Sequence, residues 1–101
     1  MSHGLYVLGE DGKTPKPVAN VIEWGNAREK ENRQVRFDEI DGVKISTVFL
    51  GIDHAFGFAV PLLFETMIFG GKHDDYQDRC STWEQAQEMH ETALRLVRGE
   101  P

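Results

Sequence analysis

The sequence predicts an α+β domain in which an antiparallel sheet of three to four strands carries two helices on one face, in the order β-α-β-β-β-α. Three observations predict this fold. Two strand-like runs flank an Asp-Gly turn within residues 34–50, a third apolar run follows at residues 62–69, and a long amphipathic helical pattern occupies residues 83–98. We therefore expect a meander of strands with the last helix packed across it.

Length and composition favour one domain spanning residues 1–101. Hydrophobic residues make up 40% and charged residues 28%, which is ordinary for a globular protein. The 11 basic and 17 acidic residues give a net charge of −6, which argues against direct nucleic-acid binding because that task needs clustered Lys and Arg. No secretion signal and no apolar run near the ~20 residues that span a bilayer is present, so we expect a cytoplasmic protein with no membrane partner.

The N-terminal third is predicted to contain one strand and one helix. A short apolar run at residues 5–8 is long enough for a strand only, and residues 9–16 are predicted to turn around Asp11-Gly12. Apolar residues then follow helical spacing from Pro17 to about Arg28, and proline is acceptable in a first helical turn.

Residues 34–50 predict a β-hairpin, for which two registers are possible. A two-residue Asp41-Gly42 loop would pair Ile40 with Val43 and place Phe37 opposite Ser46. A three-residue loop, Ile40 to Gly42, brings Asp38 opposite Lys44 and gathers apolar side chains on one face, namely Val35, Phe37, Val43, Ile45 and Phe49. We expect the second register because it segregates the apolar side chains better.

The C-terminal half is predicted to hold a third strand and the last helix. The strand covers residues 62–69, and the polar residues 72–80 form a loop. Ser81 and Glu84 match a capping box at the start of the helix. Its apolar stripe comprises Trp83, Ala86, His90, Ala93, Leu94 and Val97.

Both faces of the central strands carry apolar residues. Val48, Leu50 and Ile52 supply the second face of the middle strand, and the phenylalanines of residues 49–69 exceed what one face of such a sheet needs. We expect a protein partner, such as a second copy of the chain, to cover part of this surface.

Three segments, STVFLGIDHAFG, PLLFETMIFGG and STWEQAQEMH, occur here in an order and spacing that resembles a family of small uncharacterised proteins encoded by bacteriophages and prophages. The resemblance extends to LYVL and GKTPKPV near the N-terminus. Residues 58–60 are more apolar here than the glycine-rich loop of those relatives, and Cys80 stands where an aromatic residue is common. The resemblance implies a phage or prophage source more than a function, because the family has no assigned enzymatic activity and so supplies no catalytic residues to carry over.

Asp53 and His54 are the first candidate site, because they lie in a loop between two buried strands. One interpretation makes His54 a general base or metal ligand with Asp53 as its partner. The other, which we favour, has Asp53 capping the turn while His54 covers an apolar edge. The surrounding residues that we expect to take part in binding are Phe56, Phe58, Trp83 and His90.

The acidic loop of residues 73–78 and the single cysteine give weaker signals. His73, Asp75 and His90 form an alternative metal-ligand set, but their spacing matches no known metal motif, so we expect no metal and no other cofactor. Cys80 precedes a helix start, where the pKa of a thiol can fall, yet no histidine stands at a fixed short spacing to activate it.

Three functions are compatible with these features. The leading hypothesis is a non-enzymatic phage or prophage accessory protein that binds a host or viral protein as a homodimer, for example as an inhibitor of bacterial defence. One alternative is a protein that sequesters a small ligand, such as a nucleotide signal, between aromatic side chains and loop glycines. The other is a metal-assisted hydrolase that uses the Asp53-His54 loop.

Overall fold

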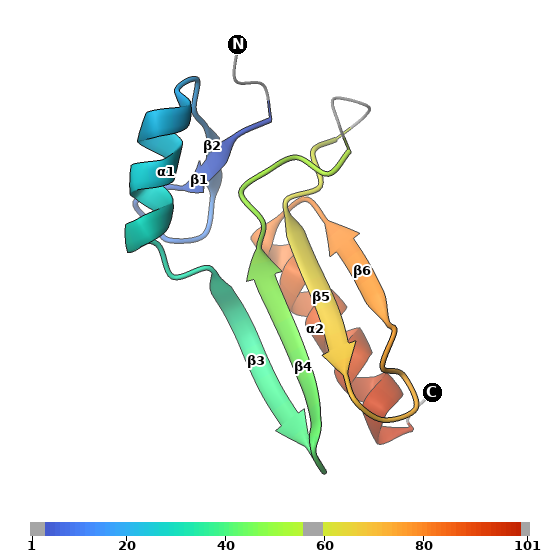
Figure 1. The fold of residues 1–101 in the computed structure, drawn as a ribbon. Helices are drawn as coiled ribbons and strands as arrows, with labels where there is room; N and C mark the ends of the chain where they lie inside the picture. The colour runs from blue at the N-terminus through green and yellow to red at the C-terminus, as the bar shows by residue number, and fades with distance from the viewer. Residues whose placement is uncertain (1–3, 56–59, 100–101) are drawn as a thin grey trace.

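The computed structural model describes residues 4–55 and 60–99. The α+β class is confirmed, with two antiparallel sheets and two helices (Figure 1). The two-stranded sheet pairs β1 with β2, and the four-stranded sheet has the order β3-β4-β5-β6. The elements are β1 (Tyr6–Leu8), β2 (Pro15–Pro17), α1 (Val21–Lys30), β3 (Gln34–Ile40), β4 (Val43–Phe49), β5 (Phe64–Phe69), β6 (Gln77–Cys80) and α2 (Trp83–Arg98).

Helix α2 covers one face of the four-stranded sheet and contacts all of its strands, whereas α1 contacts β1 (Figure 1). The alternation of side chains along a strand turns the buried residues of β4 and β5 toward α2. Two apolar clusters form there. One contains Phe49, Leu63, Phe64, Ala86 and Met89, and the other contains Ile45, Ile68, Ala93 and Leu94.

The hairpin register that we expected is wrong. The observed pairing joins Ile40 to Val43, Phe37 to Ser46 and Asp38 to Ile45, so the loop has two residues. Asp41 and Gly42 both have positive φ, at 49° and 83°, as the favoured two-residue hairpin turn requires. Phe37 is consequently on the face turned away from α2, and Asp38 is on the face that α2 covers.

We call the sheet face turned away from α2 the outer face. None of the helices among the described residues packs on it. The strand pairing and side-chain alternation place these residues on it: Phe37, Glu39, Lys44, Ser46, Val48, Glu65, Met67, Phe69, Gln77 and Arg79. It is a mixed face, because charged and apolar side chains alternate across the strands.

Gly51 is the point at which the N-terminal elements meet the end of β4. Its carbonyl accepts hydrogen bonds from the Trp24 indole at 3.0 Å and from the Tyr6 amide at 2.9 Å. Its φ of +76° favours glycine, and a Cβ at this position would overlap the Arg28 guanidinium. Glycine is therefore required here by both backbone conformation and packing.

Several element boundaries differ from those expected. Residues 77–80 form the edge strand β6 instead of part of a loop, and β5 begins at Phe64. Helix α1 begins at Val21, because the Asn20 side chain caps the amides of Ile22 and Glu23.

The capping box of α2 is shifted by one residue from the expected position. Thr82 and Gln85 form it, in place of Ser81 and Glu84. Gly99 ends the helix in the left-handed conformation, which glycine adopts without a steric penalty.

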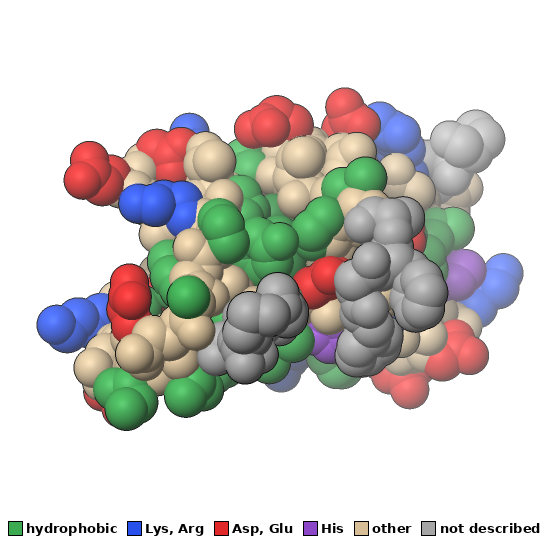
Figure 2. All heavy atoms as spheres, turned by 90° about the horizontal axis from the view of Figure 1, so that it is seen from above, with side chains coloured by type: hydrophobic (Ala, Val, Ile, Leu, Met, Phe, Trp, Pro, Cys, Tyr) green, Lys and Arg blue, Asp and Glu red, His purple; other side chains and the backbone are tan. Residues whose placement is uncertain are grey.

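Figure 2 looks down on the end of the molecule that carries β1, β2 and α1; hydrophobic side chains gather toward the middle of this view and charged side chains toward its rim. Exposed apolar residues at this end include Ile22 and Val60. No helix in the described part of the chain has the length and hydrophobicity needed to cross a membrane.

Candidate functional site

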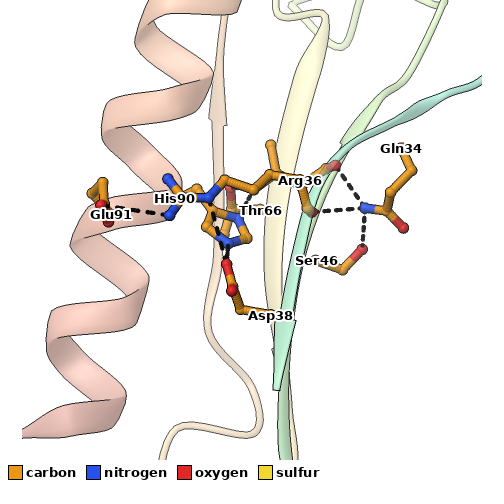
Figure 3. Close-up of polar contacts among 8 residues, drawn as sticks. Gln34, Arg36, Asp38, Ser46, Thr66, His90 and Glu91 are labelled. Carbon is orange, nitrogen blue, oxygen red and sulfur yellow. Dashed lines mark hydrogen bonds and ion pairs between the residues drawn. The ribbon is translucent and has the colours of Figure 1, made fainter. Parts of the chain in front are cut away.

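A continuous hydrogen-bonded chain of polar side chains runs through the layer between α2 and the sheet (Figure 3). Thr66 Oγ1 lies 2.5 Å from Thr47 Oγ1, and Thr47 Oγ1 lies 2.7 Å from His90 Nδ1. On the other side of the ring, His90 Nε2 lies 2.8 Å from Asp38 Oδ2. One histidine thus connects α2 to β3, β4 and β5.

The direction of each hydrogen bond follows from the ionised Asp38 carboxylate, which can only accept. Nε2 of His90 must therefore carry the proton that is donated to Asp38, and in the neutral ring Nδ1 is then an acceptor. Thr47 gives its single hydroxyl proton to Nδ1, so Thr66 must donate to Thr47. All donors in the chain point from Thr66 toward Asp38.

Burial sets the charge state of this site. The side chains of His90, Thr47 and Thr66 are each 0% exposed. Burial lowers the pKa of His90, and the hydrogen bond to Asp38 opposes that shift only in part. His90 is therefore a neutral hydrogen-bonding group near pH 7.

The hydrogen-bonded series of side chains reaches the surface at Asp38, whose side chain is 40% exposed. Arg36 lies between two acids there. Its Nε is 3.4 Å from Asp38 Oδ2, and its Nη2 is 3.5 Å from Glu91 Oε1 on α2. Figure 3 shows Arg36 reaching from β3 toward both the helix and the buried ring.

Strand register brings these residues together. Arg36 pairs with Thr47 across β3 and β4, and Thr47 pairs with Thr66 across β4 and β5. An irregularity between Gln34 and Arg36 interrupts the regular pairing, and the Gln34 amide covers it by donating to the carbonyls of Arg36 and Thr47. The pairing of the strands therefore aligns Arg36, Thr47 and Thr66 in a row across the sheet.

This geometry favours a positioning role for His90 over a catalytic one. Both ring nitrogens are already hydrogen-bonded, and the ring has no exposed surface that a substrate could approach. A satisfied buried polar network of this kind fixes strand register and helix orientation, because any other packing would leave polar groups unpaired.

The Asp53-His54 loop has the geometry of a backbone cap. Asp53 is 7% exposed, and its Oδ1 accepts hydrogen bonds from the amides of Ala55 and Leu62 at 2.7 and 3.0 Å. His54 Nδ1 lies 2.9 Å from the carbonyl oxygen of Ile52. The contacts of Asp53 are those of the capping role that the sequence favours for it.

The alternative metal ligands do not gather. Among residues 4–55 and 60–99, no group of three His, Cys, Asp or Glu side chains lies close enough to hold a metal ion. His90 is inside the layer beneath α2, whereas His73 borders a small hollow near the end of that helix. Asp74 in the acidic loop accepts from the Gly70 amide and closes the turn after β5.

The remaining candidates lie in different surroundings. Burial raises the pKa of the Cys80 thiol to about 11, which is the opposite of the activation considered from its position before a helix. Trp83 packs edge-on against Phe64 and borders a hollow beside β1. Phe56 and Phe58, which we expected to take part in binding, lie outside the described residues.

Sequence reasoning missed most of the buried chain. The expected register turns Asp38 away from α2, and no sequence motif marks Thr47, Thr66 or Arg36. The available signal was the pair of threonines at inward positions of two otherwise apolar strands, together with a histidine on an apolar helical stripe.

Comparisons of the chain with protein-family models, with curated proteins and with solved structures found no match.

Proposed function

We propose that this chain is a non-enzymatic accessory protein of a bacteriophage or prophage, which acts in the host cytoplasm by binding proteins through its outer face. One observation carries the proposal. Phe37 and Phe69 are 49% and 46% exposed on a sheet face that no described helix covers. Two half-exposed phenylalanines on one face are the kind of aromatic anchors around which protein interfaces form.

The surroundings of these two side chains support a contact surface. Met67 and Val48 add partly exposed apolar area to the same face. Charged groups accompany this area: Arg79 is paired with Glu65 at 2.9 Å, and Lys44 stands opposite Glu39. An apolar centre with charged neighbours is the usual anatomy of a specific interface.

A second copy of the chain is the first partner that we propose. The face carries both signs of charge. Its acidic residues include Glu39 and Glu65, and its basic residues include Lys44 and Arg79. Two copies related by a twofold axis can therefore meet without net repulsion, which an all-acidic surface would prevent.

A host or viral protein is the second partner. The net charge of −6 favours association with a basic surface. Inhibition of a bacterial defence protein is the specific form of the function that we propose.

Sedimentation velocity over a broad concentration series tests the homodimer. The variants are Phe37→Ser and Phe69→Ser on the outer face, with Ile22→Ser as the matched control, because Ile22 is 71% exposed on α1. We expect the wild type and the control to associate and the two outer-face variants to remain monomeric. A wild type that stays monomeric throughout the series contradicts the homodimer.

Affinity capture from a bacterial lysate, followed by reconstitution with the purified captured protein, tests the host partner. We expect wild type and Ile22→Ser to bind that protein directly and the double variant Phe37→Ser/Phe69→Ser to lose it. A purified partner that binds all three proteins equally would place the contact elsewhere.

A further inference from the structure

A hollow of about 480 Å³ opens at the end of the outer face nearest α1. It lies where the end of α1, the start of β3 and the end of β4 meet, and its lining includes Arg28, Glu31, Arg33, Gln34, Val48 and Leu50. The size falls within the range of small-molecule sites. Its lining combines two arginines with apolar residues.

Arg28 is held rigidly in this hollow. Its side chain is 15% exposed, and the guanidinium carbon lies 5.0 Å from the centre of the Trp24 ring. Because Gly51 has no side chain, the Arg28 guanidinium can occupy the space beside it. The cation is therefore preorganised by stacking and packing, so that little side-chain entropy remains to be lost on binding.

Glu31 neutralises Arg28 incompletely. Its Oε1 lies 3.9 Å from Arg28 Nη1, beyond hydrogen-bonding distance, and neither buried atom has a hydrogen-bond partner among the described residues. The other carboxylate oxygen of Glu31 accepts from the Leu8 amide at 2.9 Å. Glu31 is thus shared between the backbone of β1 and a long ion pair.

Arg33 adds a second positive charge to the same hollow. Burial and, after it, the charge of Arg33 lower the pKa of the Arg28 guanidinium, which indicates that the two cations are close enough to repel. The charged lining comprises these two arginines and one glutamate. The charged residues that line the hollow therefore carry one excess positive charge, in a chain whose net charge is −6.

We propose that this hollow binds the carboxylate of a small organic acid between Arg28 and Arg33, with the apolar body of the acid against Val48 and Leu50. A single negative charge balances the excess positive charge, and a planar carboxylate matches the fork of guanidinium donors. A phosphate dianion would bring excess negative charge next to Glu31. This site adjoins the protein contact proposed above through Val48, but its charge recognition depends on the arginines and not on the exposed phenylalanines.

Titration of the ¹⁵N-labelled protein with benzoate, followed by amide chemical shifts, tests the site. Benzamide is the control ligand, since it has the same shape and no charge, and inorganic phosphate is the doubly charged control. Arg33→Gln is the main variant because Arg33 is exposed. Arg95→Gln, which removes a charge from the exposed side of α2, is the matched control.

We expect benzoate to shift the amides of residues 28–34 and 48–50 in a saturable manner and benzamide to leave them in place. Arg33→Gln should weaken benzoate binding by about tenfold or more, whereas Arg95→Gln should bind as the wild type does. Equal responses to benzoate and benzamide, tighter binding of phosphate than of benzoate, or an unchanged affinity in Arg33→Gln would each overturn the proposal.

Discussion

The Nε2 atom of His90 lies 2.8 Å from Oδ2 of Asp38, although the two residues are 52 positions apart in the chain. The contact joins α2 to the edge strand β3 through a ring that has no exposed surface. It depends on the two-residue turn at Asp41-Gly42, because that register turns Asp38 toward the helix. The same register turns Phe37 outward, so one turn decides both the buried site and the proposed contact surface.

The stability of the protein should fall as the pH drops below about 6.5. The pKa of His90 in the folded state is lowered by burial, so the unfolded chain binds a proton at a pH where the folded chain does not. Stability is therefore fully present above the unfolded pKa and is lost as the pH falls from there toward the folded pKa. Urea unfolding at a series of pH values measures this slope.

The variant His90→Asn is the control for this pH dependence. It should be less stable than the wild type near pH 7, because the buried chain is broken, and its stability should change less between about pH 7 and pH 5. Asp11 does not contribute to the slope between about pH 7 and pH 5, since its lowered pKa of about 2 affects stability in a more acidic range. An unchanged slope in His90→Asn would show that His90 is not the group responsible.

The middle position of Thr47, between Thr66 and His90, predicts unequal effects at the two buried threonines. Thr47→Val deprives both His90 Nδ1 and the Thr66 hydroxyl of partners, and it should cost about 2–3 kcal/mol of unfolding free energy. Thr66→Val leaves the bond from Thr47 to His90 intact and should cost about 1 kcal/mol. Equilibrium unfolding of the single variants and the double variant measures these costs.

The double variant Thr47→Val/Thr66→Val should cost less than the sum of its parts. The change Thr66→Val removes the same hydroxyl that Thr47→Val alone leaves buried without a partner, so that penalty disappears in the double variant. Equal single effects that add would contradict the middle position of Thr47 in this hydrogen-bonded chain of side chains.

Gly51 and Gly42 form a matched pair for testing the junction at the end of β4. Both have positive φ, at 76° and 83°, but a Cβ at Gly42 would meet nothing within 4 Å. Gly42→Ala should therefore cost about 1–2 kcal/mol from backbone strain alone. Gly51→Ala should cost about 2–4 kcal/mol, since it also displaces the Arg28 guanidinium. Thermal and urea unfolding would give the two values, and equal costs would argue against the packing of Arg28 on Gly51.

Cys80 should react slowly with alkylating reagents. Its pKa of about 11 leaves few thiolate ions near pH 8, so alkylation of the folded protein should be on the order of a hundredfold slower than alkylation of the urea-unfolded chain. Mass spectrometry of the iodoacetamide reaction over time measures both rates. Similar rates in the two states would mean that Cys80 is neither buried nor shifted in pKa as described.

The sequence predicted the fold class and most strands because those features depend on local periodicity. The apolar stripe around Ala86, His90 and Ala93 gave α2, and the runs on either side of Asp41-Gly42 gave the hairpin. Segregation of apolar side chains, taken alone, predicts the wrong register for this hairpin. The buried face instead carries Asp38, whose partner on α2 is more than 50 residues away.

The sequence does not reveal strand β6, for a related reason. Its residues Gln77 to Arg79 are polar, and its outward side chains pair with Glu65 on the neighbouring strand. No local apolar alternation marks such an edge strand, so only the neighbouring strand β5 reveals it. Local patterns therefore predict elements well and predict their polar long-range partners poorly.

The burial of Phe37 and Phe69 in a contact across the outer face can be measured by ¹⁹F NMR of protein labelled with fluorophenylalanine. Signals of Phe37 and Phe69, assigned by single substitutions, are recorded with a soluble paramagnetic relaxation agent at high and low protein concentration. Both signals should be protected in the associated state and become strongly relaxed on dilution, while an exposed label introduced at Ile22 should be relaxed throughout. Strong relaxation of Phe37 and Phe69 at every concentration, and in the presence of any purified partner that binds the chain, would contradict this contact.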